Sequence, residues 1–341
     1  MLKKLASVSA LALAVTLTGC SAGGTNPDAS GAESYSWDMT ITVGNTSTWY
    51  EGAEYFADTL NDETDGRIEV NIFTNEQLSG GDPAAGVEQL MNGDKDLSYN
   101  STIIYAGIDP KYGAVNAPFL YADYEEAEDT LAATGLDAYR ALAAPAGVQV
   151  LGFGESGFRQ ITNNVRAIST PDDLAAMKMR IPGIGLFTDI YRELGANPTT
   201  LNFSEVFTAL QQGTIDGQEN PVEVTHSSGI TEVQDHMTMW NYVYDPLILG
   251  MNKALFDSLS ADDQELVLRV SAEANAIQIQ ANRDKDADSL QEMKDSGMEV
   301  TELTAAERNV FVERMVSVKE KYASTWGEDM VAGVTPNSTQ P

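Results

Sequence analysis

The 341-residue sequence contains one cysteine, Cys20, and two histidines, His226 and His236. A single cysteine excludes a disulfide within the chain. The histidines lie ten positions apart and match no familiar metal-binding spacing. Carboxylates are abundant, but no sequence pattern pairs a nucleophile with a base. We therefore expect no metal, no cofactor and no catalytic residues.

Positive charge is also scarce, because 20 lysines and arginines stand against 51 aspartates and glutamates, for a formal net charge of −31. Such a surface repels the phosphate backbone, so nucleic acid is not an expected partner. An anionic ligand would need a locally positive cleft. After the N-terminal leader, no apolar run is long enough to predict a transmembrane helix.

The N-terminal leader has the pattern of a secretion signal. Lys3 and Lys4 precede an apolar run from Leu5 to Leu17, and the sequence Leu17-Thr18-Gly19-Cys20 follows. This order is typical of a bacterial lipoprotein signal. We predict a signal peptide over residues 1–20 with lipidation of Cys20, and a flexible tether over residues 21–35. The protein would then be extracytoplasmic and lipid-anchored to the cell membrane.

About 320 residues remain after the signal, which suggests two domains. Strand-like Met39–Val43 and Ile68–Ile72 flank a helical pattern at Ala53–Leu60. This order predicts an α/β fold with doubly wound sheets. Ser260 opens a helical pattern that continues to the region of Met293, which predicts one very long helix.

The stretch from Glu155 to Pro221 contains two arginines beside strand-like sequence, Arg159 and Arg180. Met177, Met179 and Ile181 alternate with polar residues, so a short strand places Arg180 on its polar side. Strand and helix patterns then alternate as far as Pro221. Loops at the carboxyl ends of such strands form ligand sites in open α/β sheets.

Many ordered pieces of this stretch resemble the solute receptors of tripartite ATP-independent periplasmic (TRAP) transporters, the dicarboxylate-receptor family. The matching pieces are Gly157-Phe158-Arg159, Ile161-Thr162-Asn163, Thr170-Pro171-Asp172-Asp173-Leu174, Lys178-Met179-Arg180-Ile181-Pro182, Leu194-Gly195-Ala196-Asn197-Pro198, Phe203-Ser204-Glu205-Val206, Ala209-Leu210-Gln211-Gln212-Gly213 and Asp216-Gly217-Gln218-Glu219-Asn220-Pro221. The resemblance continues more weakly through most of the chain after the leader. It implies a periplasmic-binding-protein-like fold of two α/β domains joined by a hinge, with a long helix spanning both.

On this basis domain I is expected to comprise residues 36–156 and 246–285, and domain II residues 157–245 and 286–332. Residues 333–341 are expected to form a disordered tail.

The glycines between Gly152 and Gly157 formally match a dinucleotide-binding Gly-x-Gly-x-x-Gly motif. No helical pattern follows them, as that fold requires, so we interpret them as part of the hinge.

The resemblance also implies the ligand contacts. Arg180 would bind the ligand carboxylate as a two-pronged fork, and Arg159 would support the same anion. Asn220 would hydrogen-bond the ligand, and Phe203 would pack on it.

Three further residues, Trp49, Asn100 and Tyr105, lie near predicted strand ends of domain I. We take them as additional candidates for ligand contact, with a purely structural role as the alternative for each.

The function that follows is that of an extracytoplasmic solute-binding protein. It would capture a small organic acid, either a sugar acid such as a uronate or a C4-dicarboxylate, and deliver it to the membrane permease subunits of a TRAP transporter. We expect a monomer. The alternative is a secreted α/β enzyme, a hydrolase or lyase, acting on a carboxylate substrate.

Overall fold

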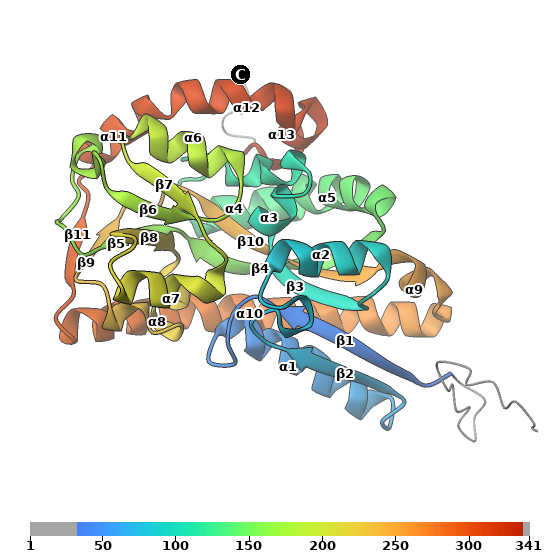
Figure 1. Cartoon of the computed structure of the whole chain (residues 1–341). Helices are drawn as coiled ribbons and strands as arrows, with labels where there is room; N and C mark the ends of the chain where they lie inside the picture. The colour runs from blue at the N-terminus through green and yellow to red at the C-terminus, as the bar shows by residue number, and fades with distance from the viewer. Residues whose placement is uncertain (1–32, 337–341) are drawn as a thin grey trace, which may run out of the picture.

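The computed structural model describes residues 33–336 and has two mixed sheets surrounded by helices (Figure 1). The first sheet has the strand order β2-β1-β3-β10-β4. Its strands are β1 (Tyr35–Ile41), β2 (Ile68–Phe73), β3 (Leu97–Ser101), β4 (Val148–Phe158) and β10 (Tyr244–Asn252). β1 runs parallel to β2 and β3, whereas β10 is antiparallel to both β3 and β4.

The second sheet has the order β11-β9-β5-β8-β6-β7. Its strands are β5 (Gln160–Asn163), β6 (Lys178–Ile181), β7 (Asn197–Thr200), β8 (Gly217–Asn220), β9 (His236–Met239) and β11 (Glu299–Glu302). β6 is parallel to β7 and β8, and β5 is antiparallel to β8 and β9. The predicted α/β class with two sheets is therefore confirmed, and each sheet contains one strand, β10 or β5, that runs antiparallel to its neighbours.

Capping residues in the sequence set the starts of the principal helices. Ser47 accepts a hydrogen bond from the Tyr50 amide at the start of α1, and Asp82 accepts from two amides at the start of α2. Asn202 and Glu205 form the predicted capping box of α7. The helices other than α10 are α1 (Thr48–Glu63), α2 (Pro83–Asn92), α3 (Thr102–Ala106), α4 (Tyr124–Thr130), α5 (Leu136–Ala143), α6 (Gly185–Glu193), α7 (Phe203–Gln211), α8 (Val222–Ser227), α9 (Lys253–Ser258), α11 (Ala305–Arg314), α12 (Val316–Trp326) and α13 (Glu328–Val334).

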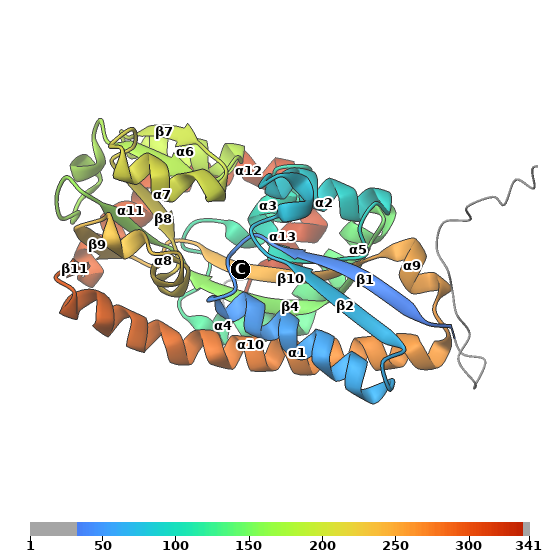
Figure 2. The same cartoon turned by 60° about the horizontal axis from the view of Figure 1, so that its bottom comes forward.

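Helix α10 (Ala261–Asp295) confirms the predicted long helix. Ser260 caps it by accepting from the Asp263 amide. Figure 2 shows α10 running under both sheets, from β1 and β2 at one end to β9 and β11 at the other. It packs against α1, β4 and α8, so one rigid element supports both halves of the molecule.

The chain passes between the sheets at two places that lie side by side. β4 ends at Phe158 and β5 begins at Gln160, so only Arg159 separates the two strands. On the return, β9 ends at Met239 and β10 begins at Tyr244. The strand ends thus lie two residues from the predicted domain boundaries at 156 and 246.

The glycines of β4 have a packing role that the sequence did not reveal. A Cβ atom on Gly154 would lie 1.9 Å from the Tyr99 hydroxyl, and one on Gly152 would lie 2.5 Å from the Asn275 amide nitrogen of α10. Both positions therefore require glycine because α10 and β3 approach the strand closely. Only Gly157, with φ of 110°, adopts a backbone conformation that itself favours glycine.

Two predicted end segments need correction. β1 already begins at Tyr35, within the predicted tether. The predicted disordered tail begins too early, because Gly333 and Val334 belong to α13 and their carbonyl groups accept hydrogen bonds from Thr134 and Tyr121, each of 2.7 Å. The signal peptide, Cys20 and the tether up to residue 32 lie outside the described residues, as do residues 337–341.

None of the helices within residues 33–336 combines the length and the apolar character needed to cross a membrane.

Candidate ligand-binding site

A cavity of about 130 Å³ lies between the two sheets. This is far more space than one water molecule needs. The lining comes from both sides and includes residues that end or follow the parallel strands β1, β3, β6, β7 and β8: Thr42, Val43, Ser101, Pro182, Gly183, Leu201, Asn202 and Asn220. The carboxyl ends of parallel strands thus meet at one cavity, where open α/β sheets bind ligands.

Arg180 lines this cavity as a buried cation, with 4% of its surface exposed. Its Nε and Nη2 donate to the carbonyl oxygen of Leu201 at 3.0 and 2.7 Å, and its guanidinium lies 5.9 Å from the centre of the Phe203 ring. Within residues 33–336 it forms no ion pair with a carboxylate. Burial therefore lowers the pKa of Arg180 to about 10. An anion in the cavity would supply the missing partner.

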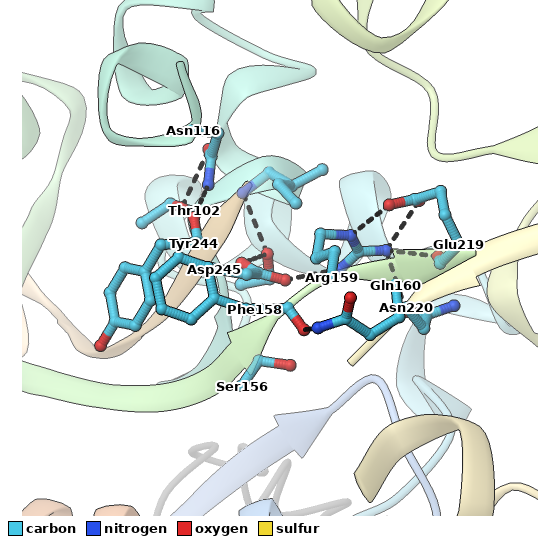
Figure 3. Close-up of polar contacts among 12 residues, drawn as sticks. Thr102, Asn116, Ser156, Phe158, Arg159, Gln160, Glu219, Asn220, Tyr244 and Asp245 are labelled. Carbon is cyan, nitrogen blue, oxygen red and sulfur yellow. Dashed lines mark hydrogen bonds and ion pairs between the residues drawn. The ribbon is translucent and has the colours of Figure 1, made fainter. Parts of the chain in front are cut away.

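Arg159 also lines the cavity, but its guanidinium is already paired. Figure 3 shows it lying between Glu219 and Asp245. Nε and Nη2 donate to the two carboxylate oxygens of Glu219 at 2.5 and 2.8 Å, and Nη1 donates to Asp245 at 2.6 Å. Burial acts to lower the pKa of Arg159, but Glu219 and Asp245 overcome it and hold that pKa above its ordinary value. Arg159, which was predicted to support the ligand anion beside Arg180, thus mainly forms the centre of an ion-pair network.

Asp245 contributes a buried carboxylate to the cavity wall. It accepts hydrogen bonds from the Ser101 hydroxyl and from Arg159. Burial nevertheless raises the pKa of Asp245 to about 6, against the lowering effect of Arg159. Glu219 lies behind the cavity and is held by Arg159 and by the Tyr242 hydroxyl, which donates at 2.7 Å.

The structure brings three more predicted site residues to the same cavity. Asn220 ends β8, and its Oδ1 accepts from Arg159 at 2.9 Å. Phe203 is the first residue of α7 and Trp49 lies in the first turn of α1. All three line the cavity together with Arg180. The buried indole N–H of Trp49 has no hydrogen-bond partner among the described residues.

The other two predicted contacts are corrected, because neither lines the cavity. Asn100 is fully buried in the first sheet, where it accepts from Thr42 and donates to Glu76 and Ser98. Tyr105 is also fully buried and packs against Tyr112, with 5.3 Å between ring centres. Both side chains face the interior behind β3. Asn100 does so because alternate residues of a strand point to opposite faces of the sheet, and Tyr105 because it lies on the inner side of α3.

Sequence reasoning missed Asp245 and Glu219. One signal for Asp245 was present, since an acid followed by Pro246 interrupts the otherwise apolar run from Tyr242 to Met251. A charged residue in a buried strand requires a partner. The partner, Arg159, could not be identified from a sequence separation of 86 residues.

Comparison with known proteins matches residues 39–325 to the family model of bacterial extracellular solute-binding protein, family 7. The chain belongs to this family. Its similar solved structures include solute-binding proteins of TRAP transporters, and the predicted family resemblance is therefore confirmed. Members of this family bind solutes outside the cytoplasm, and several are named as periplasmic binding proteins.

Three similar proteins illustrate the family. The 2,3-diketo-L-gulonate-binding periplasmic protein YiaO of Escherichia coli is 30% identical over 78% of this chain and 80% of its own length. A TRAP solute-binding protein of Ralstonia eutropha H16 with bound (S)-2-acetolactate has a TM-score of 0.85 and 31% identity, covering 87% and 97% of the two chains. The sugar acid binding protein DctPAm of Advenella mimigardefordensis, in complex with galactonate, has a TM-score of 0.84 and 29% identity, covering 89% and 97%.

Proposed function

We propose that this solute-binding protein captures a small organic acid in the cavity beside Arg180 and delivers it to the membrane permease of a TRAP transporter. The observation that carries the proposal is a buried arginine that lines the cavity and has no carboxylate partner within residues 33–336. A buried cation is costly unless it is paired, so the site is suited to an anion that arrives from solution. The acids bound by the similar proteins, acetolactate and galactonate, each offer such a carboxylate.

We further propose that the cavity lies between two domains that close on the ligand, with domain I formed by residues 36–156 and 246–285 and domain II by residues 157–245 and 286–332. Contacts around the cavity join the two sides. The Thr46 hydroxyl donates to the Ser227 carbonyl at 2.9 Å, and the Thr48 amide donates to Glu223 at 3.1 Å. Such contacts would break when the domains separate about a hinge.

The alternative, an enzyme acting on a carboxylate, is not favoured by the cavity. Its lining contains no histidine, lysine or cysteine that could serve as a base or nucleophile beside the arginines. We propose that the protein binds its ligand without changing it and acts as a monomer, without a nucleic acid partner.

The binding proposal predicts a thermal shift with particular organic acids. A bound acid stabilises the folded state by mass action, by about 2.7 kcal/mol at 100 times its dissociation constant. A screen of mono- and dicarboxylates should raise the melting temperature for a few related acids. Mass spectrometry of the ligand released on denaturation should return the acid unchanged. If the acid is converted during incubation, the protein is an enzyme.

The lipid anchor is proposed from the sequence Leu17-Thr18-Gly19-Cys20. A diacylglyceryl group plus an acyl chain buries enough methylene groups for stable membrane attachment. Cys20→Ser should move the protein from the detergent-extracted membrane fraction to the soluble fraction, whereas Ser21→Ala should leave it in the membrane. A Cys20→Ser protein that stays membrane-bound would refute the anchor.

A further inference from the structure

The cavity offers one unpaired positive charge. Among its lining residues the only cations are Arg159 and Arg180. Arg159 is shared between the carboxylates of Glu219 and Asp245, so its charge is already more than balanced. Arg180 has no carboxylate partner among the described residues, so only this guanidinium is free to receive an anion.

The remaining charge in the wall is negative. Asp245 is fully buried, and Asp82 lines the cavity at the start of α2. An ionised carboxylate can only accept hydrogen bonds, so Asp245 can receive a hydroxyl donor from a ligand but repels a second carboxylate. A dicarboxylate bound through Arg180 would therefore bury its second charge without a cation to pair with it.

The other polar groups of the wall are largely committed. The Ser101 hydroxyl donates to Asp245 and accepts from the Ile103 amide, while the Thr42 hydroxyl donates to Asn100. Asn220 donates to Gln218 and accepts from Arg159. A ligand with many hydroxyl groups would leave several of them without partners.

Most of the remaining wall is apolar. It is formed mainly by Val43, Trp49, Ile103, Ile104, Ile184 and Val224. In the buried part of the cavity, the groups still able to bond a ligand are Arg180, the unsatisfied indole N–H of Trp49 and the lone pairs of Asp245, whereas Thr200 and Asn202 line its exposed part. This set suits one carboxylate, one or two further oxygen atoms and an aliphatic body.

We infer that the ligand is a short-chain hydroxy monocarboxylate with a compact aliphatic body, and that Asp245 selects it by accepting its hydroxyl and rejecting dicarboxylates. This inference rests on the proposed function, and it narrows the ligand class expected from the sequence. Arg180 binds the ligand carboxylate. Asp245 favours ligands whose remaining part carries no second negative charge.

Calorimetry at pH 8 with a defined panel tests the inference. The probes are 2-hydroxy-3-methylbutanoate, 3-methylbutanoate, succinate, monomethyl succinate and galactonate. The hydroxy acid should bind about 10-fold or more tightly than 3-methylbutanoate, because a hydrogen bond to a charged acceptor is lost in the latter. It should bind roughly 100-fold or more tightly than succinate. Monomethyl succinate should bind more tightly than succinate, because its ester end carries no negative charge.

The outcomes separate the two proposals. Succinate or galactonate as the tightest ligand would overturn the inference and leave the binding function intact. Equal binding of succinate and its monomethyl ester would show that Asp245 does not discriminate by charge. If a wide screen of acids yields no binding at all, the proposed function itself fails.

Two variants test whether Asp245 determines the preference between the hydroxy acid and succinate. Asp245→Asn keeps an acceptor for Arg159 and removes the charge, so it should reduce the preference for 2-hydroxy-3-methylbutanoate over succinate by about 10-fold or more. The matched control is Asp286→Asn in α10. Asp286 accepts from the Tyr124 hydroxyl at 2.9 Å and lies outside the cavity lining. The Asp286→Asn variant should leave the preference unchanged. An unchanged preference in Asp245→Asn would contradict the inference.

Discussion

Arg180→Ala is expected to weaken binding of the organic acid by roughly 30-fold to several thousand-fold. A ligand carboxylate in the cavity loses its water and needs parallel charged donors in return. Removing one partner of a buried charge pair costs about 2–5 kcal/mol, and each 1.4 kcal/mol is about a factor of ten in affinity. Isothermal titration calorimetry of the folded variant measures the loss directly.

Arg180→Lys is the conservative control. Lysine keeps the charge but lacks the two parallel N–H donors of the planar guanidinium, so it should restore only part of the affinity. The free protein should tolerate both variants. Among the residues that the structure describes, the Arg180 guanidinium donates to the Leu201 carbonyl alone, and its removal leaves no carboxylate there unpaired. Wild-type affinity in Arg180→Ala would show that this arginine does not bind the acid.

Arg159→Met should instead destabilise the fold by about 3–5 kcal/mol. The variant leaves Glu219 and Asp245 buried without their cation, and an uncompensated buried charge is among the costliest defects in a protein. Methionine retains the volume of the aliphatic stem, so the loss reports charge and not packing. Urea denaturation, monitored by circular dichroism, gives the change in unfolding free energy.

The pH dependence of this loss provides its own check. The pKa of Asp245 is already raised by burial to about 6, above its value in an unfolded chain. The folded protein therefore binds a proton on Asp245 more tightly than the unfolded chain does. The loss of unfolding free energy caused by ionised Asp245 thus becomes smaller as the pH drops through about 6. Without Arg159 that cost is larger. The stability deficit of Arg159→Met should thus be greater at pH 8 than at pH 5.5.

Arg180→Met is the matched substitution for this comparison, because it removes the other buried arginine of the same cavity. It should abolish tight binding and lower stability much less than Arg159→Met. Equal destabilisation by the two variants would contradict the division of roles between an anion-binding arginine and a structural one.

The sequence predicted those features that depend on local pattern. Ser260 and the periodicity after it predicted the long helix α10, and Lys178–Ile181 forms the strand that delivers Arg180. The capping box at Asn202 and Glu205 predicted the start of α7. Local hydrogen bonds and side-chain periodicity determine these features, so a single sequence reveals them.

Features that depend on distant partners were not predictable in the same way. Arg159 and Asp245 meet only because β4 and β10 pair across the two crossings between the sheets. The close packing of Gly152 and Gly154 against Asn275 and Gln278 of α10 could not be recognised from the glycine spacing. Asn100 lay at the expected strand end but points to the interior. A one-residue difference in strand position decides which face a side chain occupies.

The most direct test of the account is a crystal structure of the protein with the tightest-binding acid of the panel. We predict that the ligand carboxylate lies against Arg180, with nitrogen–oxygen distances of about 2.7–2.9 Å, while Arg159 keeps its bonds to Glu219 and Asp245. A hydroxyl group of the ligand should face Asp245. A carboxylate bound elsewhere, with Arg180 left unpaired, would contradict the account.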